Sequence, residues 1–427
     1  MSVSTAPLPS SPLPALLLFY RYLLTCLATG SPPADSRLPE SSRLYLLNLY
    51  LPLKLWRRQH YRADSYGRDI SDNLSNIALP HTAVPLHWFC LHPALAALYV
   101  LLVLPLMCLG AARKEGSGGG GFAKRLLDDE SWFTYWRMNC NLAAYHSMVT
   151  RDGRDNESDD IKGYRMENKF EFLAKAPPLD VPVSPYLDFP IVVKHRSIEG
   201  GMGIHFYSNA VSGGDWIIQK TIDNSAFLKT LLPPNAPLST FRVLTQSRNS
   251  ILGAGAPKDL AGLKKNIAPL TCVFRAGRAG ALTDHTSLLF NVALPGGKIT
   301  SAGTNDHWYR TLFKTFNPPV STDRVTRHPD NPAKELAGVQ IPNIDSIIET
   351  CVDTHAKMLP DVPFVGFDVV LTDSPDVPGG ICLLEVNLSC NFFGGDFDRG
   401  SWREFLAEGL EWCEKQDKEA GGDKKRD

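Results

Sequence analysis

The apolar and polar positions of this chain form two patterns. A long uncharged run lies early in the sequence, and alternating, strand-like runs lie later. The uncharged run is Leu86–Ala112, which contains no Asp, Glu, Lys or Arg. It exceeds the ~20 residues that an α-helix needs to cross a bilayer. We therefore expect a transmembrane helix over residues 86–112. A buried helix interrupted by Pro93 and Pro105 is the alternative.

Charges on either side of the uncharged run predict its orientation. Arg68 is the only nearby cation before the run, whereas a basic cluster follows it: Arg113, Lys114, Lys124 and Arg125. Basic residues accumulate on the cytosolic side of membrane helices. The pattern predicts a single-pass protein whose C-terminal domain faces the cytosol.

The remaining segments before the alternating region carry less information. Residues 1–85 begin with a Pro- and Ser-rich stretch, and Arg21 interrupts the apolar run that follows, which does not suit a cleaved signal peptide. Arg43–Arg62 is typical of a basic amphipathic helix at a membrane surface, or of an ordinary solvated helix. Gly116–Gly121 predicts a flexible linker within residues 113–125, and residues 126–164 suggest a helical lead-in followed by an acidic loop.

Alternation is clearest over Val365–Asn387, where two apolar, β-branched runs flank a turn rich in Pro, Asp and Gly. This pattern predicts a β-hairpin. Asp368, Glu385 and Asn387 interrupt the apolar runs. Residues 385 and 387 share one face of their strand, and pairing brings Asp368 alongside them. Two carboxylates and an amide oxygen suit Mg²⁺ held between protein and phosphate oxygens; a hairpin whose polar residues face water is the alternative.

A glycine-rich turn lies between two predicted strands upstream. Phe189–Lys194 predicts a strand that ends in Lys194, and Ser197–Gly203 separates it from the strand Ile204–Ser208. Such a turn can lie over phosphates, because backbone N–H groups approach closely where no Cβ intervenes. An ordinary hairpin turn is the alternative.

Three further elements surround this turn. Glu167–Lys175 predicts a short helix that starts with Asn168 and Lys169, Trp216–Ile222 predicts an apolar strand, and Pro237–Thr245 predicts a strand that carries Arg242.

Composition narrows the protein class. At 427 residues and 44% hydrophobic, the chain can bury a sizeable core in more than one structural unit. A net charge of −1, with no basic stripe in the C-terminal two thirds, does not favour nucleic acid as a partner. The nine scattered cysteines show no C-x-x-C spacing, which argues against a zinc site or a disulfide framework and favours a reducing compartment.

In the order and spacing of these motifs, residues 165–412 resemble the ATP-grasp superfamily. Within it the chain is most similar to domains associated with sugar transfer, and more distantly to tubulin tyrosine ligase-like enzymes. The resemblance implies an α+β, ATP-grasp fold over residues 165–415, in which two α+β subdomains with antiparallel sheets grip ATP. A helical, membrane-associated region precedes it, and a charged tail, residues 416–427, follows.

The resemblance also implies roles for individual residues. It assigns ATP binding to two lysines, a flap and a hinge strand, namely Lys169, Lys194, Glu199, Gly200, Gly201, Met202, Gly203, Gln219, Lys220 and Ile222, with Asp223 toward the ribose. It assigns Arg242, together with Lys194, to the transferring γ-phosphate. It assigns Mg²⁺, or Mn²⁺ in its place, to Asp368, Glu385 and Asn387.

The activity implied is that of a carboxylate–amine ligase acting on small-molecule or peptide substrates through an acyl phosphate. A small-molecule kinase and a membrane-anchored nucleotide-binding protein without turnover are the alternatives. A kinase needs a general base, for which Asp284, His285, Asp306 and His307 are candidates by position; a ligase needs a carboxylate clamp, for which Arg275 and Arg278 are candidates. No α/β domain is recognisable before Lys169, so the family's substrates do not carry over.

Overall fold

The computed structural model describes residues 7–29, 33, 38–62, 64–73, 86–114, 116–127, 142–147, 149, 159–187, 189–194, 204–209, 216–252, 255–284, 287–300, 325–388, 404–405, 408–409, 411–412 and 415. The chain divides into two compact units. The N-terminal unit comprises Met1–Asn156, Asp306–Thr322 and Asp398–Asp427, and the sheet unit comprises Glu157–Asn305 and Asp323–Phe397. The expected mixed α+β class with antiparallel sheets is confirmed.

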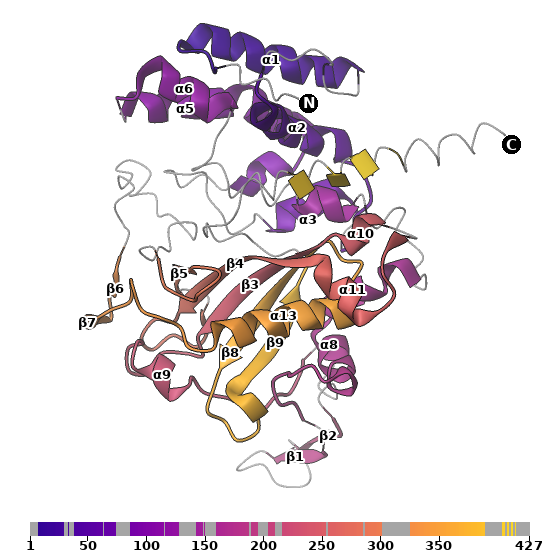
Figure 1. Cartoon of the computed structure of the whole chain (residues 1–427), viewed down its shortest axis with the longest axis vertical. Helices are drawn as coiled ribbons and strands as arrows, with labels where there is room; N and C mark the ends of the chain where they lie inside the picture. The colour runs from indigo at the N-terminus through magenta and orange to yellow at the C-terminus, as the bar shows by residue number, and fades with distance from the viewer. Residues whose placement is uncertain are drawn as a thin grey trace, which may run out of the picture. The chain divides into compact units, whose positions relative to one another are not determined.

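The N-terminal unit is helical (Figure 1). Its helices are α1 (Pro12–Thr29), α2 (Glu40–Leu55), α3 (Tyr66–Asn73), α4 (Pro93–Leu98), α5 (Leu104–Lys114) and α6 (Gly118–Leu127). Residues Leu86–Cys90 form a 3₁₀ turn, and Tyr99–Val103 form a π-helical turn between α4 and α5. One apolar core joins α1, α2, α3, α5 and α6 with the π-helical turn Tyr99–Val103.

The predicted 86–112 helix begins later than expected. Helix α4 begins at Pro93, and the His92 side chain caps it by accepting a hydrogen bond from the Ala94 N–H at 3.1 Å. A proline at the first turn of a helix loses no hydrogen bond, so Pro93 starts the helix instead of breaking it. Two helical segments, Pro12–Thr29 and Pro93–Gly110, are long and apolar enough to cross a membrane; length and composition alone do not separate such a span from a core helix.

Pro105 lies inside this helix without ending it. A proline has no N–H and its ring displaces the carbonyl four residues earlier, here that of Leu101. The π turn just before Pro105 accommodates the ring. The freed Leu101 carbonyl accepts a hydrogen bond at 2.7 Å from the Tyr20 hydroxyl of α1.

The glycine-rich segment differs from the expected flexible linker. Gly118–Gly121 form the first turn of α6, which packs on α1 and α5. A Cβ on Gly119 would lie 2.6 Å from the Ser10 carbonyl oxygen and 2.9 Å from the Pro12 side chain. Close backbone approach therefore explains this glycine. Of the helical lead-in expected from residue 126, residues 126–127 close α6 and residues 142–147 are helical; residues 128–141 lie outside the described part of the chain.

A five-stranded antiparallel sheet forms the centre of the other unit, in the order β5-β4-β3-β8-β9. The strands are β3 (Thr240–Ser247), β4 (Ile267–Ala276), β5 (Leu288–Val292), β8 (Phe364–Leu371) and β9 (Ile381–Asn387). The hairpin predicted over Val365–Asn387 is confirmed as β8 and β9, with Asp368 directly opposite Glu385.

Helix α13 (Ile344–Met358) covers one face of this sheet (Figure 1). Its buried His355 lies against Phe367 and hydrogen-bonds the Thr245 hydroxyl at 2.7 Å. Residues 241, 243, 245 and 367 consequently face α13. The alternate residues of β3 and β8, such as Arg242 and Asp368, face the other way, and that face carries the candidate site.

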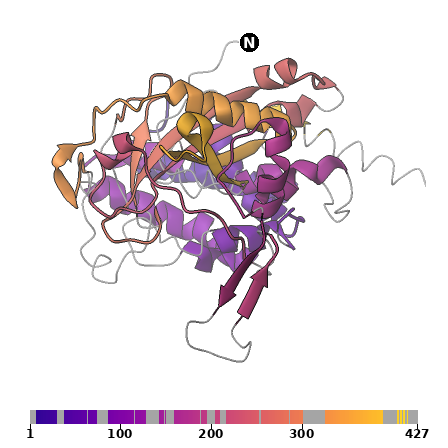
Figure 2. The same ribbon diagram turned by 90° about the horizontal axis from the view of Figure 1, so that it is seen from below.

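Two small hairpins complete the strands. One consists of β1 (Ile191–Lys194) and β2 (Ile204–Tyr207), which project away from the five-stranded sheet (Figures 1 and 2). The other consists of β6 (Arg327–His328) and β7 (Asn331–Glu335). The expected strand 189–194 begins two residues late, since Pro190 has no N–H to donate.

The expected strand Trp216–Ile222 is wrong. The segment makes one isolated bridge, Gln219 with Tyr186, and Trp216 is 77% exposed. Its neighbour along this bridge contains Pro185, which cannot donate to a ladder, so pairing stops after two backbone hydrogen bonds.

Short helices connect the strands: α8 (Lys169–Lys175), α9 (Ala226–Lys229), α10 (Asn249–Leu252) and α11 (Leu260–Lys265). The helix predicted over 167–175 is confirmed as α8. It begins after Asn168, whose side chain accepts hydrogen bonds from the N–H groups of Phe170 and Glu171.

Candidate functional site

The sheet face opposite α13 gathers charged side chains from four strands. In antiparallel pairs, residues directly opposite each other share a face. Arg242 of β3 lies opposite Asp368 of β8, and Asp368 lies opposite Glu385 of β9. Thr240 of β3 lies opposite Arg275 of β4. The strand register therefore builds a row Arg242–Asp368–Glu385 with Arg275 beside it.

Arg242 and Asp368 form a two-pronged, buried ion pair. The Arg242 Nε donates to one carboxylate oxygen at 2.5 Å, and a terminal nitrogen donates to the other at 2.9 Å. Their side chains are 10% and 6% exposed. Such fork-shaped pairing fixes both groups in orientation as well as distance.

Arg275 links Asp368 to a second carboxylate. It donates to Asp368 at 3.3 Å and to Asp284 at 2.9 Å, and the Thr240 hydroxyl donates to the other Asp284 oxygen at 2.6 Å. All these side chains are buried or nearly so. Arg275 thus bridges the two aspartates, while Arg242 pairs with Asp368.

The surroundings shift the pKa values of the two aspartates in opposite directions. Burial works against the ionised form of Asp368, but the adjacent Arg242 and Arg275 outweigh it and hold its pKa below the ordinary value. Burial raises the pKa of Asp284, and Arg275 and the Thr240 hydroxyl only partly oppose that rise. Asp284 is therefore the better proton acceptor of the two.

Lys169, the first residue of α8, reaches the exposed end of the row. Its Nζ lies 2.6 Å from the Glu385 carboxylate, whose other oxygen accepts from the Asn387 side-chain amide at 3.2 Å. Glu385 is 22% and Lys169 60% exposed. The three predicted residues Lys169, Glu385 and Asn387 are therefore brought together.

Among the described residues, the ion pairs of this cluster join three cations to three carboxylates. The cations are Arg242, Arg275 and Lys169, and the carboxylates are Asp368, Asp284 and Glu385. Within the part of the chain that the structure describes, no group of three or more His, Cys, Asp or Glu is placed to hold a metal ion. Two carboxylates and an amide oxygen fit Mg²⁺ that takes its remaining ligands from phosphates and water.

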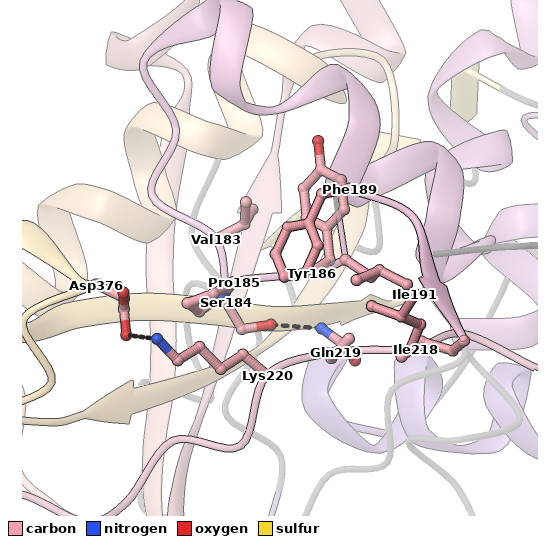
Figure 3. Close-up of a pocket in the computed structure, with 11 residues that line it drawn as sticks. Val183, Ser184, Pro185, Tyr186, Phe189, Ile191, Ile218, Gln219, Lys220 and Asp376 are labelled. Carbon is pink, nitrogen blue, oxygen red and sulfur yellow. Dashed lines mark hydrogen bonds and ion pairs between the residues drawn. The ribbon is translucent and has the colours of Figure 1, made fainter. Parts of the chain in front are cut away.

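The sheet unit also contains a pocket of about 690 Å³ (Figure 3). It is lined mainly by apolar and aromatic side chains, among them Tyr186 and Phe189. The Gln219 side chain donates to the Ser184 hydroxyl at 2.6 Å, and Lys220 pairs with Asp376 at 2.5 Å. An apolar pocket with a few fixed polar groups is the usual form of a small-molecule site.

Backbone hydrogen bonds tie the pocket to β9. The Leu383 N–H donates to the Pro182 carbonyl, and the Ser184 N–H donates to the Leu383 carbonyl, both at 3.0 Å. Leu383 precedes Glu385 by two residues on the same strand. The pocket wall and the Glu385 end of the charged row are thus attached to one strand.

Other predicted site residues lie elsewhere or are not described. Lys194 is exposed at the end of β1. Ile222 packs in a small cluster with Val370 and Cys382, and Asp223 pairs with Lys229 at 2.6 Å, which lowers the pKa of Asp223. The following predicted residues lie outside the described part of the chain: Glu199, Gly200, Gly201, Met202, Gly203, His285, Asp306 and His307.

The two arginines proposed as a substrate clamp differ in placement. Arg278 binds Asp330 through two hydrogen bonds at 2.7 and 2.8 Å, which lowers the pKa of Asp330 to about 2. It thereby anchors the β6–β7 hairpin. Arg275 lies on the charged face, so it alone of the two remains a clamp candidate.

Sequence analysis named Asp284 and Arg275 as candidates but predicted neither their ion pair nor the contact between Asp284 and Thr240. The Thr240–Asp284–Arg275 link joins residues 44 and 9 positions apart, and Lys220–Asp376 joins two loops. The one available signal was Thr240 and Arg242 at alternate positions of a strand, which places both on one face.

Comparisons with protein-family models, with curated protein sequences and with solved structures found no match to this chain.

Proposed function

We propose that the protein is an ATP- and Mg²⁺-dependent carboxylate–amine ligase of the ATP-grasp type, held at a membrane with its sheet unit in the cytosol. The observation that carries the proposal is the row Arg242–Asp368–Glu385, extended by Lys169, on a sheet whose strand β9 also holds the wall of an apolar pocket. Phosphoryl transfer needs positioned cations and a metal next to a nucleobase site more than it needs a protein nucleophile.

The pocket suits the adenine ring. Tyr186, Phe189 and the aliphatic side chains offer flat and apolar contacts, and the backbone around Gln219 and Lys220 offers polar ones. This matches the hinge role that the resemblance gives to Gln219, Lys220 and Ile222, although Ile222 would act through packing.

The neutral charge balance favours Mg²⁺ that arrives with its nucleotide. Bare Mg²⁺ would leave two uncompensated positive charges in the cluster, and it would compete with Arg242 for Asp368. A triphosphate brings compensating negative charge, and Arg242 and Lys169 can then pair with its oxygens. Asp368, Glu385 and Asn387 would hold the ion, which supplies charge neutralisation at the transferring phosphoryl group. Mn²⁺ satisfies the same oxygen ligands.

The reaction would proceed in two steps. A carboxylate oxygen of the substrate attacks the γ-phosphorus and ADP leaves; an amine then attacks the acyl carbon, inorganic phosphate leaves and the amine loses a proton. Arg275 is the residue we assign to orient the substrate carboxylate, since it lies on the charged face between Asp284 and Asp368.

A small-molecule kinase is the second candidate, and Asp284 is the observation that favours it. A buried carboxylate with a raised pKa beside the charged row suits a general base for a hydroxyl acceptor. A nucleotide-binding protein without turnover is the third candidate. We rank it last because each described position to which the resemblance assigns a charged residue carries one.

Isotope tracing separates these functions. Full-length protein in detergent would be given γ-labelled ATP, Mg²⁺ and a pooled extract of metabolites and peptides. A ligase releases labelled inorganic phosphate only when carboxylates and amines are both present. Label retained on a small molecule indicates a kinase, and nucleotide binding without label movement indicates a protein without turnover. Absence of both binding and transfer overturns the proposal.

A further inference from the structure

Two rows of exposed leucines lie on helices of the N-terminal unit. On α1 the row is Leu13, Leu17, Leu24 and Leu27, which are 45–66% exposed. Along α4 and α5 it is Leu91, Leu95, Leu98, Leu102 and Leu106, which are 37–62% exposed. Spacings of three, four and seven residues place each row on one face of its helix. Single exposed leucines are ordinary, but continuous rows mark an interaction surface.

A hydrogen bond connects the two helices that carry the rows, and both helices pack on α6. In the first turn of α6, a Cβ on Gly119 would lie 2.6 Å from the Ser10 carbonyl oxygen, so the start of α1 lies against this turn. The Tyr20–Leu101 hydrogen bond joins the helices near their midpoints. Leu17 and Leu24 lie three and four residues from Tyr20 and share its face. The rows therefore flank one helix–helix contact.

Most of the remaining circumference of these helices is covered by protein. Ala96, Tyr99, Val100, Leu104 and Cys108 are buried, and α2 and α6 pack against the pair. The covering elements carry charge on their outer surfaces, at Lys54 of α2, Lys124 of α6 and the exposed Arg68–Asp72 pair of α3. Exposed charges of this kind are costly inside hydrocarbon, so the unit as a whole does not suit a bilayer interior.

Charged residues next to the rows suit lipid headgroups. Arg21 is exposed near the middle of α1, where a spanning helix would place it near the bilayer centre. In a helix that lies along the surface, Arg21 reaches the headgroup layer instead. Arg113, exposed at the end of α5, does the same. Cations beside an apolar face complement anionic lipids.

We propose that α1 and the α4–α5 helix lie in the plane of a membrane surface, with both leucine rows inserted into one leaflet that contains anionic lipid. This inference deepens the proposed membrane attachment and replaces the single span expected from the sequence. It does not depend on the ligase activity.

Vesicle flotation tests the contact surface. Full-length wild-type protein should float with phosphatidylcholine vesicles that contain phosphatidylserine, and less without it. The double variant L98E/L102E should bind at least about 10-fold more weakly, because it replaces two inserted apolar side chains by charges. The matched control L252E/L282E changes two exposed leucines of the sheet unit, 43% and 98% exposed, and should bind as wild type does.

Labelling tests the in-plane arrangement. The variants S10C and T29C place thiols at the two ends of α1, both exposed, whereas the described cysteines are buried. In sealed microsomes that carry the full-length protein, a membrane-impermeant maleimide should label both positions before permeabilisation as fully as after it.

Three results would overturn the inference. Failure of wild type to float removes both the in-plane arrangement and the proposed membrane attachment. Protection of one end of α1 until permeabilisation keeps the attachment but establishes a span. Conversion of a wild-type dimer to a monomer by L98E/L102E shows that a second copy covers the rows. Melting curves of the Glu variants equal to that of the control confirm that the loss of binding is not a loss of folding.

Discussion

The two faces of the five-stranded sheet are made by alternate residues of the same strands, and they differ in almost every physical respect. Toward α13 lie Phe241, Phe274 and Phe367, all fully buried, with Phe241 stacked on Phe274 at 5.0 Å between ring centroids. On the opposite face lie arginines and carboxylates. Apolar burial provides most of the stability of a sheet. The α13 face can therefore stabilise a fold whose other face retains costly buried charges.

The ion pairs of the charged face are expected to contribute less to stability than the apolar packing against α13. Replacing a buried ion pair by apolar residues is often neutral or stabilising. Each carboxylate there already has a protein partner, and those partners are the groups that a nucleotide would need. Substitutions on the two faces should therefore separate stability from activity.

The largest expected effect is on the α13 face. Phe367→Ala removes a fully buried ring and should lower the free energy of unfolding by about 3–5 kcal/mol. Urea denaturation followed by circular dichroism measures it. The same change at Phe206, which is 75% exposed, should alter stability by less than about 1 kcal/mol. Similar losses at both positions would contradict the assignment of the core to the α13 face.

The second effect is on activity and comes from the charged face. Glu385→Gln keeps the size of the side chain but removes the charge that would face Lys169 and Mg²⁺. We expect phosphoryl transfer to fall by about 10²–10³-fold, with stability within about 1 kcal/mol of wild type. Glu171→Gln is the matched control, because its pair with Lys175 is exposed on α8. Unchanged transfer in Glu385→Gln would remove this residue from the metal site.

The third effect concerns pH and again belongs to the α13 face. Burial lowers the pKa of His355 to about 4, against 6.5 for the free side chain. The unfolded chain then binds a proton at higher pH than the folded one, so stability falls as pH drops from 6.5 toward 4. The loss is on the order of 1–3 kcal/mol. His355→Gln keeps hydrogen-bonding capacity but does not titrate, so its urea midpoints should depend less on pH across this range. If the pH dependence of the midpoint were unchanged, it would arise from other groups.

How far the sequence predicts this molecule differs between the same two faces. Strand alternation locates Asp368, Glu385 and Arg242, because a period of two is a local property of the backbone. Asp284 and Arg275 could be named as candidates, but their pairing with each other and with Asp368 depends on strand order and register, which no local pattern specifies. The strand predicted at Trp216–Ile222 is wrong for a related reason. Pairing depends on both segments, and the partner segment contains Pro185.

The smallest expected effect compares two buried threonine hydroxyls. Thr240 donates to Asp284, whereas the hydroxyl of Thr271 is buried without a hydrogen-bond partner among the described residues. Thr240→Val should cost about 1 kcal/mol at neutral pH and raise the pKa of Asp284 further, because it removes a donor to the ionised carboxylate. The cost should shrink as pH falls and Asp284 becomes protonated. Thr271→Val should be neutral or stabilising, since it removes an unsatisfied polar atom. Denaturation of both variants at several pH values measures the difference; equal costs would mean that the Thr240–Asp284 hydrogen bond contributes nothing to holding the charged face in place.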